Sequence, residues 1–280
     1  MPSTYAHDRY GMMVLRNFPD LPGLSEDAVL KNLETFRIGC QGPDLFFYYI
    51  AGKKDPAKPL GSRIHYEPAE RFLRRIPKLP AEEPEETKER KLSYLAGFLC
   101  HFTLDSCCHL YIEALIHRFD VPHSFVEGEF ERFLMEKDGE DPVRFCVTDG
   151  RIVPSKRSAE AAAWFYPEAD EKVLLHAMTD MVKIHHLLYA PHAAKRALID
   201  AVLRLAGKYK ELGGHVVRPE ADDRLLSGDR ELLRRMEDAV PLASDLMRNA
   251  FDWYLSGGEL DPYFQRNFEA GPDWKSIQIP

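Results

Sequence analysis

Apolar residues recur at three- and four-residue intervals along most of this 280-residue chain, which is the spacing of one face of an α-helix. A sustained alternation of apolar and polar residues is missing from the sequence, apart from a short stretch around residues 144–153 that is compatible with a strand. The pattern therefore predicts an all-α fold. Because we find no internal repeat and no strong boundary, we expect residues 1–280 to form a single multi-helix domain.

Helix start and stop signals, such as Ser or Asp before an apolar-periodic segment and Pro or Gly after it, set the expected boundaries. The predicted helices cover residues 25–36, 44–51, 86–117, 124–137, 168–189, 192–212 and 228–255. The Pro- and Glu-rich segment 77–86 is expected to be a solvated linker, residues 138–154 a loop, and residues 258–280 an irregular tail. Residues 155–257 thus supply additional helices.

The predicted helix 86–117 carries three metal-capable side chains at four-residue steps, His101, Asp105 and His109, within an apolar segment. Residues at i, i+4 and i+8 of a helix drift by only about 40° per step, so these side chains point nearly the same way. An ionised aspartate among Phe, Leu and Cys side chains is costly without a counter-charge, and a divalent cation shared with imidazoles removes that cost. The spacing therefore predicts an interior metal site.

A second pair, His123 and Glu127, is again four residues apart at the start of the next predicted helix. The turn at Val121-Pro122 can fold this helix back against the first one, so that both side chains reach the metal region. Glu127 has an alternative role, because Ser124-Phe125-Val126-Glu127 also fits a capping box in which Ser caps the helix and Glu bonds back to its amide.

Three isolated candidates lie upstream, and each is a weak signal alone. Asp44 can simply cap its helix, and His65 can be an ordinary loop residue. Together with the others they form a set of five His, two Asp and one Glu, which suits two or three zinc-like ions and defines residues 1–135 as the metal-binding half. The eight candidate ligands are His7, Asp44, His65, His101, Asp105, His109, His123 and Glu127.

The five cysteines are an odd set without a C-x-x-C pair, so disulfides are not expected. Cys100 and Cys108 are interpreted as small buried hydrophobes rather than zinc ligands. The adjacent His185 and His186 diverge by about 100° on a helix, so they are expected to be packing or surface residues. The aromatic run Phe46-Phe47-Tyr48-Tyr49 is expected to pack in the core, with a pocket wall as its alternative role.

The formal net charge of −8 argues against a nucleic-acid partner or a protein that lives on anionic lipid, because phosphate binding needs clustered Lys and Arg. Residues 1–10 lack the basic start and apolar segment of a secretory signal, and no stretch approaches eighteen apolar residues. We therefore expect a cytoplasmic protein without a transmembrane segment.

The order His7, Gly42-Pro43-Asp44, His65, Gly97-x-x-x-His101-x-x-x-Asp105-x-x-x-His109 and His123-x-x-x-Glu127 resembles the bacterial zinc-dependent phospholipase C family, which is related to zinc-dependent nucleases. The resemblance covers about residues 1–135, and the start Met-Pro-Ser-Thr-Tyr-Ala-His-Asp-Arg-Tyr-Gly is similar to intracellular members. It implies a hydrolase in which a metal-activated water attacks a phosphodiester, with phospholipids or other phosphate esters as substrates.

The resemblance also implies a division of the ligands among Zn²⁺ ions. One ion would be held by Asp44, His65, His101 and Asp105, with Asp44 also orienting or deprotonating the attacking water. A second would be held by His109, His123 and Glu127. A third would join His7 and Asp105 to the N-terminal residue, which is Trp in secreted members; here, removal of Met1 would expose the amine of Pro2. The interval between Asp105 and His109 is shorter than in secreted members.

Two alternative functions compete with this hypothesis. The dipeptide His7-Asp8 could mark an HD-type phosphohydrolase, although such a site expects a His on an earlier helix and only six residues precede His7. The protein could instead be a non-catalytic helical protein with structural or ligand-binding zinc. The many carboxylates in the candidate set favour catalysis, because structural zinc more often takes Cys.

Overall fold

The computed structural model describes residues 4–50, 52, 54–269 and 271–279. These residues form helices and no strand, so the predicted all-α class is confirmed; an isolated bridge joins Leu21 and Leu24. The elements are α1 Thr4–Leu15, α2 Glu26–Lys31, α3 Leu33–Gln41, η1 Gly42–Asp44, α4 Leu45–Tyr48, α5 Leu60–Tyr66, α6 Ala69–Arg75, α7 Glu85–Phe119, α8 His123–Lys137, α9 Lys156–Ala163, α10 Glu171–Leu188, α11 Ala193–Leu205, α12 Tyr209–Leu212, η2 Gly213–His215, α13 Leu226–Ser256, η3 Pro262–Gln265 and η4 Pro272–Ser276.

Several predicted boundaries are wrong for local reasons. The helix expected over 25–36 breaks at Asn32 and resumes as α3, and the helix expected over 44–51 is the single turn α4. The strand suggested near 144–153 is a series of turns, because its amides bond to carbonyls three or four residues back and Gly150 has φ +69°. The helix expected over 192–212 is two helices, since Gly207 has φ +68° and ends α11.

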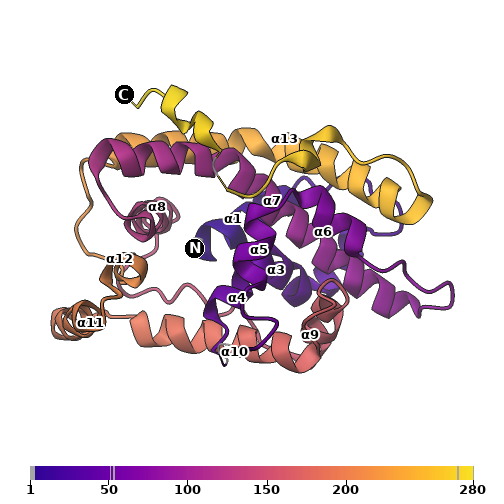
Figure 1. The fold of residues 1–280 in the computed structure, drawn as a ribbon, viewed down its shortest axis with the longest axis horizontal. Coiled ribbons are helices and arrows are strands. Elements are labelled where there is room, and N and C mark those ends of the chain that lie inside the picture. Colours follow the sequence, from indigo (N-terminus) through magenta and orange to yellow (C-terminus); the bar gives the residue numbers. More distant parts are fainter. Residues whose placement is uncertain (1–3, 51, 53, 270, 280) are drawn as a thin grey trace.

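The long helix α7 is the central element, and α13 packs along it (Figure 1). Two acids, Glu85 and Glu86, lie in its first turn, where they complement the helix dipole. Asp120, with φ +52°, ends α7 in the left-handed conformation. Pro122 then precedes the first turn of α8, so α8 folds back against α7 as predicted from the turn.

Helices α3 and α7 approach so closely that two glycines meet. A Cβ atom on Gly39 would lie 2.3 Å from the Tyr94 carbonyl oxygen, and one on Gly97 would lie 2.1 Å from the Phe36 carbonyl oxygen. Only glycine is therefore compatible with this crossing. The consequence for the site is that η1, which follows α3 directly, is brought against the middle of α7, where His101 lies.

The C-terminal residues 258–269 and 271–279 are mostly irregular, as predicted, but they pack against α7 rather than extending into solvent (Figure 1). Phe264 and Phe268 are fully buried in the main core, which also contains residues of α1 through α10 and α13. Trp274 stacks on His117 near the end of α7, with ring centroids 3.9 Å apart. Within the described residues, none of the helices combines the length and apolar character needed to cross a membrane.

Candidate metal centre

The eight candidate ligands come from α1, η1, α5, α7 and α8, and the fold brings them together around the middle of α7. All except His123 are at most 4% exposed. The side chain of His123 is 32% exposed, so it lies at the edge of the group. Residues separated by more than a hundred positions along the chain thus form one buried cluster of imidazoles and carboxylates.

Asp105 lies at the centre of the cluster, and its two oxygens face different histidines. Its Oδ1 is 3.2 Å from Nε2 of His7, while its Oδ2 is 3.1 Å from Nε2 of His101. The rings of His7 and His101 stack with centroids 4.1 Å apart. Oδ2 is also 3.6 Å from Nε2 of His65, and Oδ1 is 3.9 Å from Nε2 of His109. This arrangement allows Asp105 to bridge two cations.

Asp44 does not cap its helix, so the alternative reading of this residue is wrong. It lies where η1 passes into α4, it is fully buried, and its side chain makes no capping hydrogen bond. The closest histidine nitrogen is Nε2 of His65, 3.0 Å from Oδ1. Within the described chain neither Asp44 oxygen accepts a hydrogen bond. A fully buried carboxylate in this state needs a cation.

The second cluster joins the end of the α7 triplet to α8. Oε1 of Glu127 is 2.9 Å from Nε2 of His123 and 3.4 Å from Nε2 of His109. The capping box does not form, because α8 begins at His123 and the Ser124 hydroxyl instead donates to the Lys210 carbonyl oxygen at 3.1 Å. Glu127 is therefore directed at the two histidines rather than at the helix terminus.

Backbone carbonyl groups orient three of the ligand histidines. Because a carbonyl oxygen can only accept, the Nδ1 atom in each pair must carry the proton. In the neutral ring, Nε2 then has a lone pair that faces carboxylate oxygens, which is repulsive unless a cation lies between them. The pairs are His65 Nδ1 with Gly61 at 2.7 Å, His101 Nδ1 with Cys40 at 3.1 Å, and His109 Nδ1 with Phe268 at 2.5 Å.

The electrostatics of the cluster without a metal show the same need for positive charge. Burial opposes protonation of His65, but the nearby carboxylates of Asp105 and Asp44 raise its pKa to about 10. Burial likewise opposes protonation of His109, but the charge of Asp105 and the bond to Glu127 raise its pKa to about 10. Burial would raise the pKa of Asp105, yet the neighbouring histidines hold it well below its ordinary value.

The donor set fits zinc in its chemistry and its grouping. Imidazole nitrogens and carboxylate oxygens are ordinary zinc ligands. In each of three groups the ligand atoms lie within 4.8 Å of one another. These groups are His7 with His101 and Asp105, Asp44 with His65 and His101, and His109 with His123 and Glu127. His101 belongs to the first two of these groups, and Asp105 also lies near His65. The zinc position expected at Asp44, His65 and His101 is therefore adjacent to the position expected at His7 and Asp105.

The expected N-terminal ligand, the amine of Pro2, lies outside the described residues. In the first turn of α1, the backbone N–H of Tyr5 donates to Oε1 of Glu131 at 2.6 Å. Asp8, the acid of the HD hypothesis, is paired with Arg37 at 3.2 Å and Arg151 at 3.1 Å and belongs to none of the metal-capable groups found in the described residues. Adjacent helical residues point about 100° apart, which separates Asp8 from His7.

Sequence reasoning missed the carbonyl groups that orient the histidines, because a backbone carbonyl has no sequence signature. Phe268 is the clearest case, since it lies in the tail that was expected only to be irregular. Its N–H donates to the His65 carbonyl at 3.2 Å and its own carbonyl accepts from His109. The aromatic run after Asp44 is mainly core, as expected, with Phe46 fully packed; the Phe47 ring lies 5.2 Å from His65.

The other metal-capable residues behave largely as predicted. Cys100 and Cys108 are buried free thiols outside every metal-capable group of the described residues. His185 is buried, and its Nε2 contacts hydroxyl oxygens of Thr4 and Tyr48 at 3.0 and 3.1 Å. His186 is a surface residue whose Nε2 lies 2.8 Å from Asp149, with Cys146 nearby as a further metal-capable neighbour.

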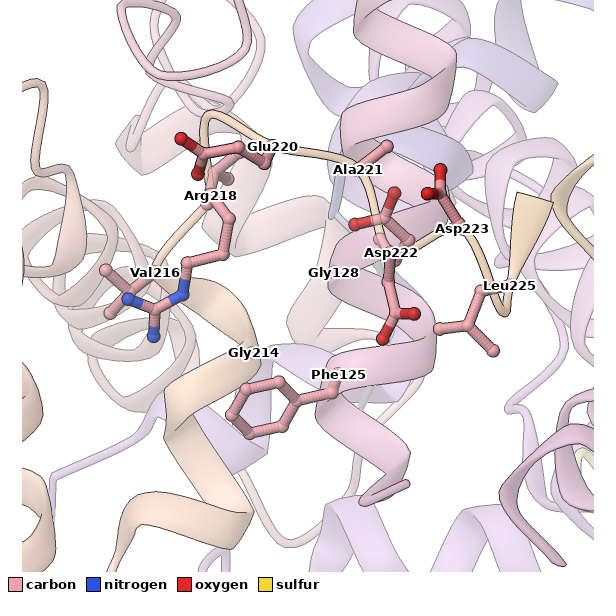
Figure 2. Close-up of a pocket in the computed structure, with 12 residues that line it drawn as sticks. Phe125, Gly128, Gly214, Val216, Arg218, Glu220, Ala221, Asp222, Asp223 and Leu225 are labelled. Carbon is pink, nitrogen blue, oxygen red and sulfur yellow. The ribbon is translucent and has the colours of Figure 1, made fainter. Parts of the chain in front are cut away.

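The metal centre is distinct from a broad surface recess of about 430 Å³ beside α8 (Figure 2). Phe125 and Gly128 form one wall of this recess, and the segment 216–225 forms the other. Carboxylates of Glu220, Asp222 and Asp223 surround it, and none of the eight candidate ligands lines it. An acidic recess repels an anionic phosphate ester, so this is not the expected substrate site.

Most of the chain matches one known protein family. This family is described as zinc dependent phospholipase C, and its model matches residues 6–193, a range that extends well beyond the ligand-bearing first half. Neither the curated proteins nor the solved structures gave a significant match to this chain. Because the family match spans well over half of a chain that also assembles the expected His and Asp ligands, the protein belongs to the zinc-dependent phospholipase C family.

Proposed function

We propose that the protein is a zinc-dependent phosphodiester hydrolase of the phospholipase C type. Asp44, His65 and His101, with Asp105, would hold one zinc ion, and His109, His123 and Glu127 a second. His7 would join Asp105 at a third. Family membership supports the zinc-dependent hydrolase class. The assignment of the individual ligands rests on the grouping of their donor atoms.

The observation that carries this proposal is the set of backbone bonds to Nδ1. Three histidines, His65 on α5 and both His101 and His109 on α7, have their Nδ1 proton directed to a carbonyl and their Nε2 directed to buried carboxylates. With Nδ1 committed to a carbonyl, the ring atom that faces the carboxylates is Nε2, and a zinc ion can take the place of its proton there, which is how histidine ligands are held ready for a cation.

Bound zinc acidifies a water molecule and neutralises the charge that develops on a phosphoryl group. The chain's own contribution is to orient that chemistry. Asp44 has both oxygens buried, and the histidine nitrogens near its Oδ2 are His101 Nδ1 at 3.7 Å and His7 Nε2 at 3.9 Å. Its carboxylate can therefore orient the attacking water and accept its proton at Oδ2. His123, the partly exposed ligand, marks the side from which a substrate would enter.

The substrate class that fits best is a phosphodiester, with a phospholipid as the finer proposal. A nucleic-acid substrate fits less well, because the formal net charge is −8 and an acidic surface repels a phosphate backbone. The core site is lined by imidazoles and carboxylates rather than by a cluster of arginines, so bound metal ions would provide the positive charge that meets the phosphate.

Elemental analysis combined with a hydrolysis panel tests the proposal. The panel contains bis(p-nitrophenyl) phosphate, phosphatidylcholine in detergent micelles and a single-stranded oligonucleotide, assayed on wild type, Asp105→Asn and Asp8→Asn. We expect at least two zinc ions per wild-type chain. Asp105→Asn should lose at least one and should slow diester hydrolysis by about 100-fold or more. Asp8→Asn is the control, because it removes a buried aspartate that belongs to no metal-capable group of the described residues. This variant should keep its zinc.

Three results would contradict this function. Fewer than one metal per chain, or unchanged diester hydrolysis in Asp105→Asn, would remove the metal mechanism. Zinc loss in Asp8→Asn with a folded protein would support the HD-type alternative instead. A full zinc complement without hydrolysis of any panel member would support structural or ligand-binding zinc.

A further inference from the structure

Helix α11 presents an apolar face to solvent. It lies at one end of the molecule, beyond α12 (Figure 1), and Leu203 is its single buried residue. Leu198, Val202 and Leu205 are 65%, 54% and 90% exposed. The sequence pattern of this segment predicts an ordinary core-facing helix, yet these apolar residues face outward.

These three residues form a continuous stripe with two alanines. Ala194, Leu198, Ala201, Val202 and Leu205 are all exposed and, at 100° per residue, lie within an arc of about 100° on the helix. We call this set the α11 stripe. A surface helix normally turns such a face toward its core, whereas the α11 stripe meets solvent.

The opposite side of α11 is firmly attached, so the stripe is not a result of a detached helix. Leu203 and Ile199 pack in a small core with Leu188 and Val216. Asp200, which shares that inner side, accepts two hydrogen bonds from Arg218 at 3.0 and 2.9 Å. The helix is therefore held in one orientation with the stripe outward.

The charge around the stripe is opposite to that of the whole chain. Residues 193–210 include five Lys or Arg and one acid, in a protein of formal net charge −8. The single acid is Asp200, whose charge is neutralised on the inner side by Arg218. Arg204 is exposed near the C-terminal end of the helix, whereas Lys208, beyond that end, is paired with Glu211 at 2.5 Å. An apolar face flanked by basic residues is complementary to an anionic lipid surface.

The size of the stripe argues against a second copy of this chain as its partner. A helix of 13 residues is about 20 Å long, and a stripe about 10 Å wide covers roughly 200 Å². A stable protein interface needs about 800 Å² from each partner. A helix that inserts one face at the lipid boundary has no such requirement, because its partner is a continuous surface.

The stripe is also connected to the exposed side of the metal centre. Helix α12, which follows α11, packs on α8 through the rings of Tyr209 and Phe125, whose centroids are 5.4 Å apart. The carbonyl of Lys210 accepts the hydrogen bond from Ser124. Helix α8 begins with His123, the partly exposed ligand. Most of α11 lies beyond residue 193, where the family match ends.

We propose that the α11 stripe docks the protein on an anionic lipid bilayer. This inference rests on the proposed function, because docking would bring the metal centre to a phospholipid substrate in the membrane. The chain's overall negative charge, which argues against lipid binding at the level of composition, is then a property of its other surfaces.

Vesicle co-sedimentation of the full-length protein tests the proposal. Vesicles of phosphatidylcholine alone are compared with vesicles that also contain phosphatidylglycerol, at low and high salt. The test variant is Leu198→Gln/Val202→Gln/Leu205→Gln. Its matched control is Leu30→Gln/Ile50→Gln/Val153→Gln, which makes three similar changes at exposed apolar positions elsewhere. Circular dichroism and thermal melting establish that both variants are folded.

We expect wild type and control to bind anionic vesicles, more weakly at high salt, and the α11 variant to lose about tenfold or more of its partition coefficient. Equal binding by the two variants would overturn the proposal, as would wild-type binding that ignores lipid charge. Concentration-dependent dimerisation abolished by the α11 variant would assign the stripe to a second copy instead. Wild-type hydrolysis of a soluble diester without vesicle binding would refute this inference alone, whereas vesicle binding without diester hydrolysis would refute only the proposed function.

Discussion

At the scale of single residues, the cluster is defined by where each proton is held. The carbonyl groups of Gly61, Cys40 and Phe268 fix the Nδ1 protons of three histidines, and the opposing carboxylates are excluded from water. Removing any one carboxylate would leave imidazoles without their counter-charge, and removing the cation requires protons to take its place between imidazole and carboxylate. The residues are therefore interdependent, and a single ligand change should affect its neighbours.

A different buried carboxyl, Asp229, gives a prediction about stability. It lies in the first turn of α13, and neither carboxylate oxygen has a hydrogen-bond partner among the described residues. Burial and the charge of Glu129 raise its pKa from 3.8 to about 8. The folded protein thus keeps a proton that the unfolded chain releases above pH 4, so the stability contribution of this residue falls as pH rises from about 4 to about 8.

Asp229→Asn should consequently stabilise the protein at high pH. Asparagine has no proton to lose, so the variant should unfold with a free energy at least about 1 kcal/mol above wild type at pH 8 and with little difference at pH 4. Urea unfolding of both proteins at several pH values measures this. A difference that does not change with pH would show that Asp229 is ionised in the folded protein.

At the scale of elements, α7 carries three ligands, but the C-terminal segment holds two ligands of different groups, His65 and His109, in place. The backbone N–H of Phe268 donates to the carbonyl of His65, and its carbonyl accepts from Nδ1 of His109. Its ring contacts the rings of His65 and His101, with centroids 5.1 and 5.7 Å apart. Phe264 is equally buried in the same segment, yet its ring packs on Phe102 and not on a ligand.

These two phenylalanines provide a matched pair. Phe268→Ala and Phe264→Ala should each destabilise the fold by about 3–5 kcal/mol, because each leaves a cavity in the core. Only Phe268→Ala should also weaken zinc binding, by about 10- to 100-fold, because the carbonyl that orients His109 loses its anchor. Zinc competition titrations at a temperature where both variants are folded measure the difference, and Phe268→Leu should restore most of the affinity. Equal zinc affinities for the two alanine variants would assign Phe268 a packing role alone.

At the scale of the whole molecule, one buried cluster collects ligand side chains from five elements, α1, η1, α5, α7 and α8. Bound metal ions would therefore link these elements to one another. A cation that binds the folded state and not the unfolded chain adds its binding free energy to folding. Without it, the fold must retain buried carboxylates and protonated imidazoles.

Zinc removal should therefore lower the melting temperature reversibly, and the effect should depend on pH. The pKa values of His65 and His109 are raised to about 10 in the metal-free protein, so zinc must displace a proton from each. The zinc affinity of each group should rise with pH between 6 and 9, by up to about tenfold per unit. Thermal melts with and without chelator, and calorimetric titrations in buffers of different ionisation enthalpy, measure the stabilisation and the proton release. Zinc binding without proton release would contradict the protonated state of these residues.

The helical class, the long helix and the eight metal-capable residues could be predicted from the sequence because they depend on local periodicity and on side-chain chemistry. His101, Asp105 and His109 share a face for reasons of helix geometry alone. Asp44 and Glu127 could not be separated from capping residues in the same way, because a capping carboxylate and a buried metal-facing carboxylate occupy the same sequence position at a helix start. Their burial and their neighbours decide between the two.

The helical class, the course of the longest helix and the set of available imidazoles and carboxylates follow from residue identity and spacing along one backbone. That Phe268, Gly61 and Cys40 hold the histidine protons, and that the stripe on α11 faces solvent, depends on how the chain folds. Backbone carbonyls carry no residue identity, and a helix has the same apolar periodicity whether its face meets a core or water. Which of these it meets depends on contacts between segments far apart in the chain.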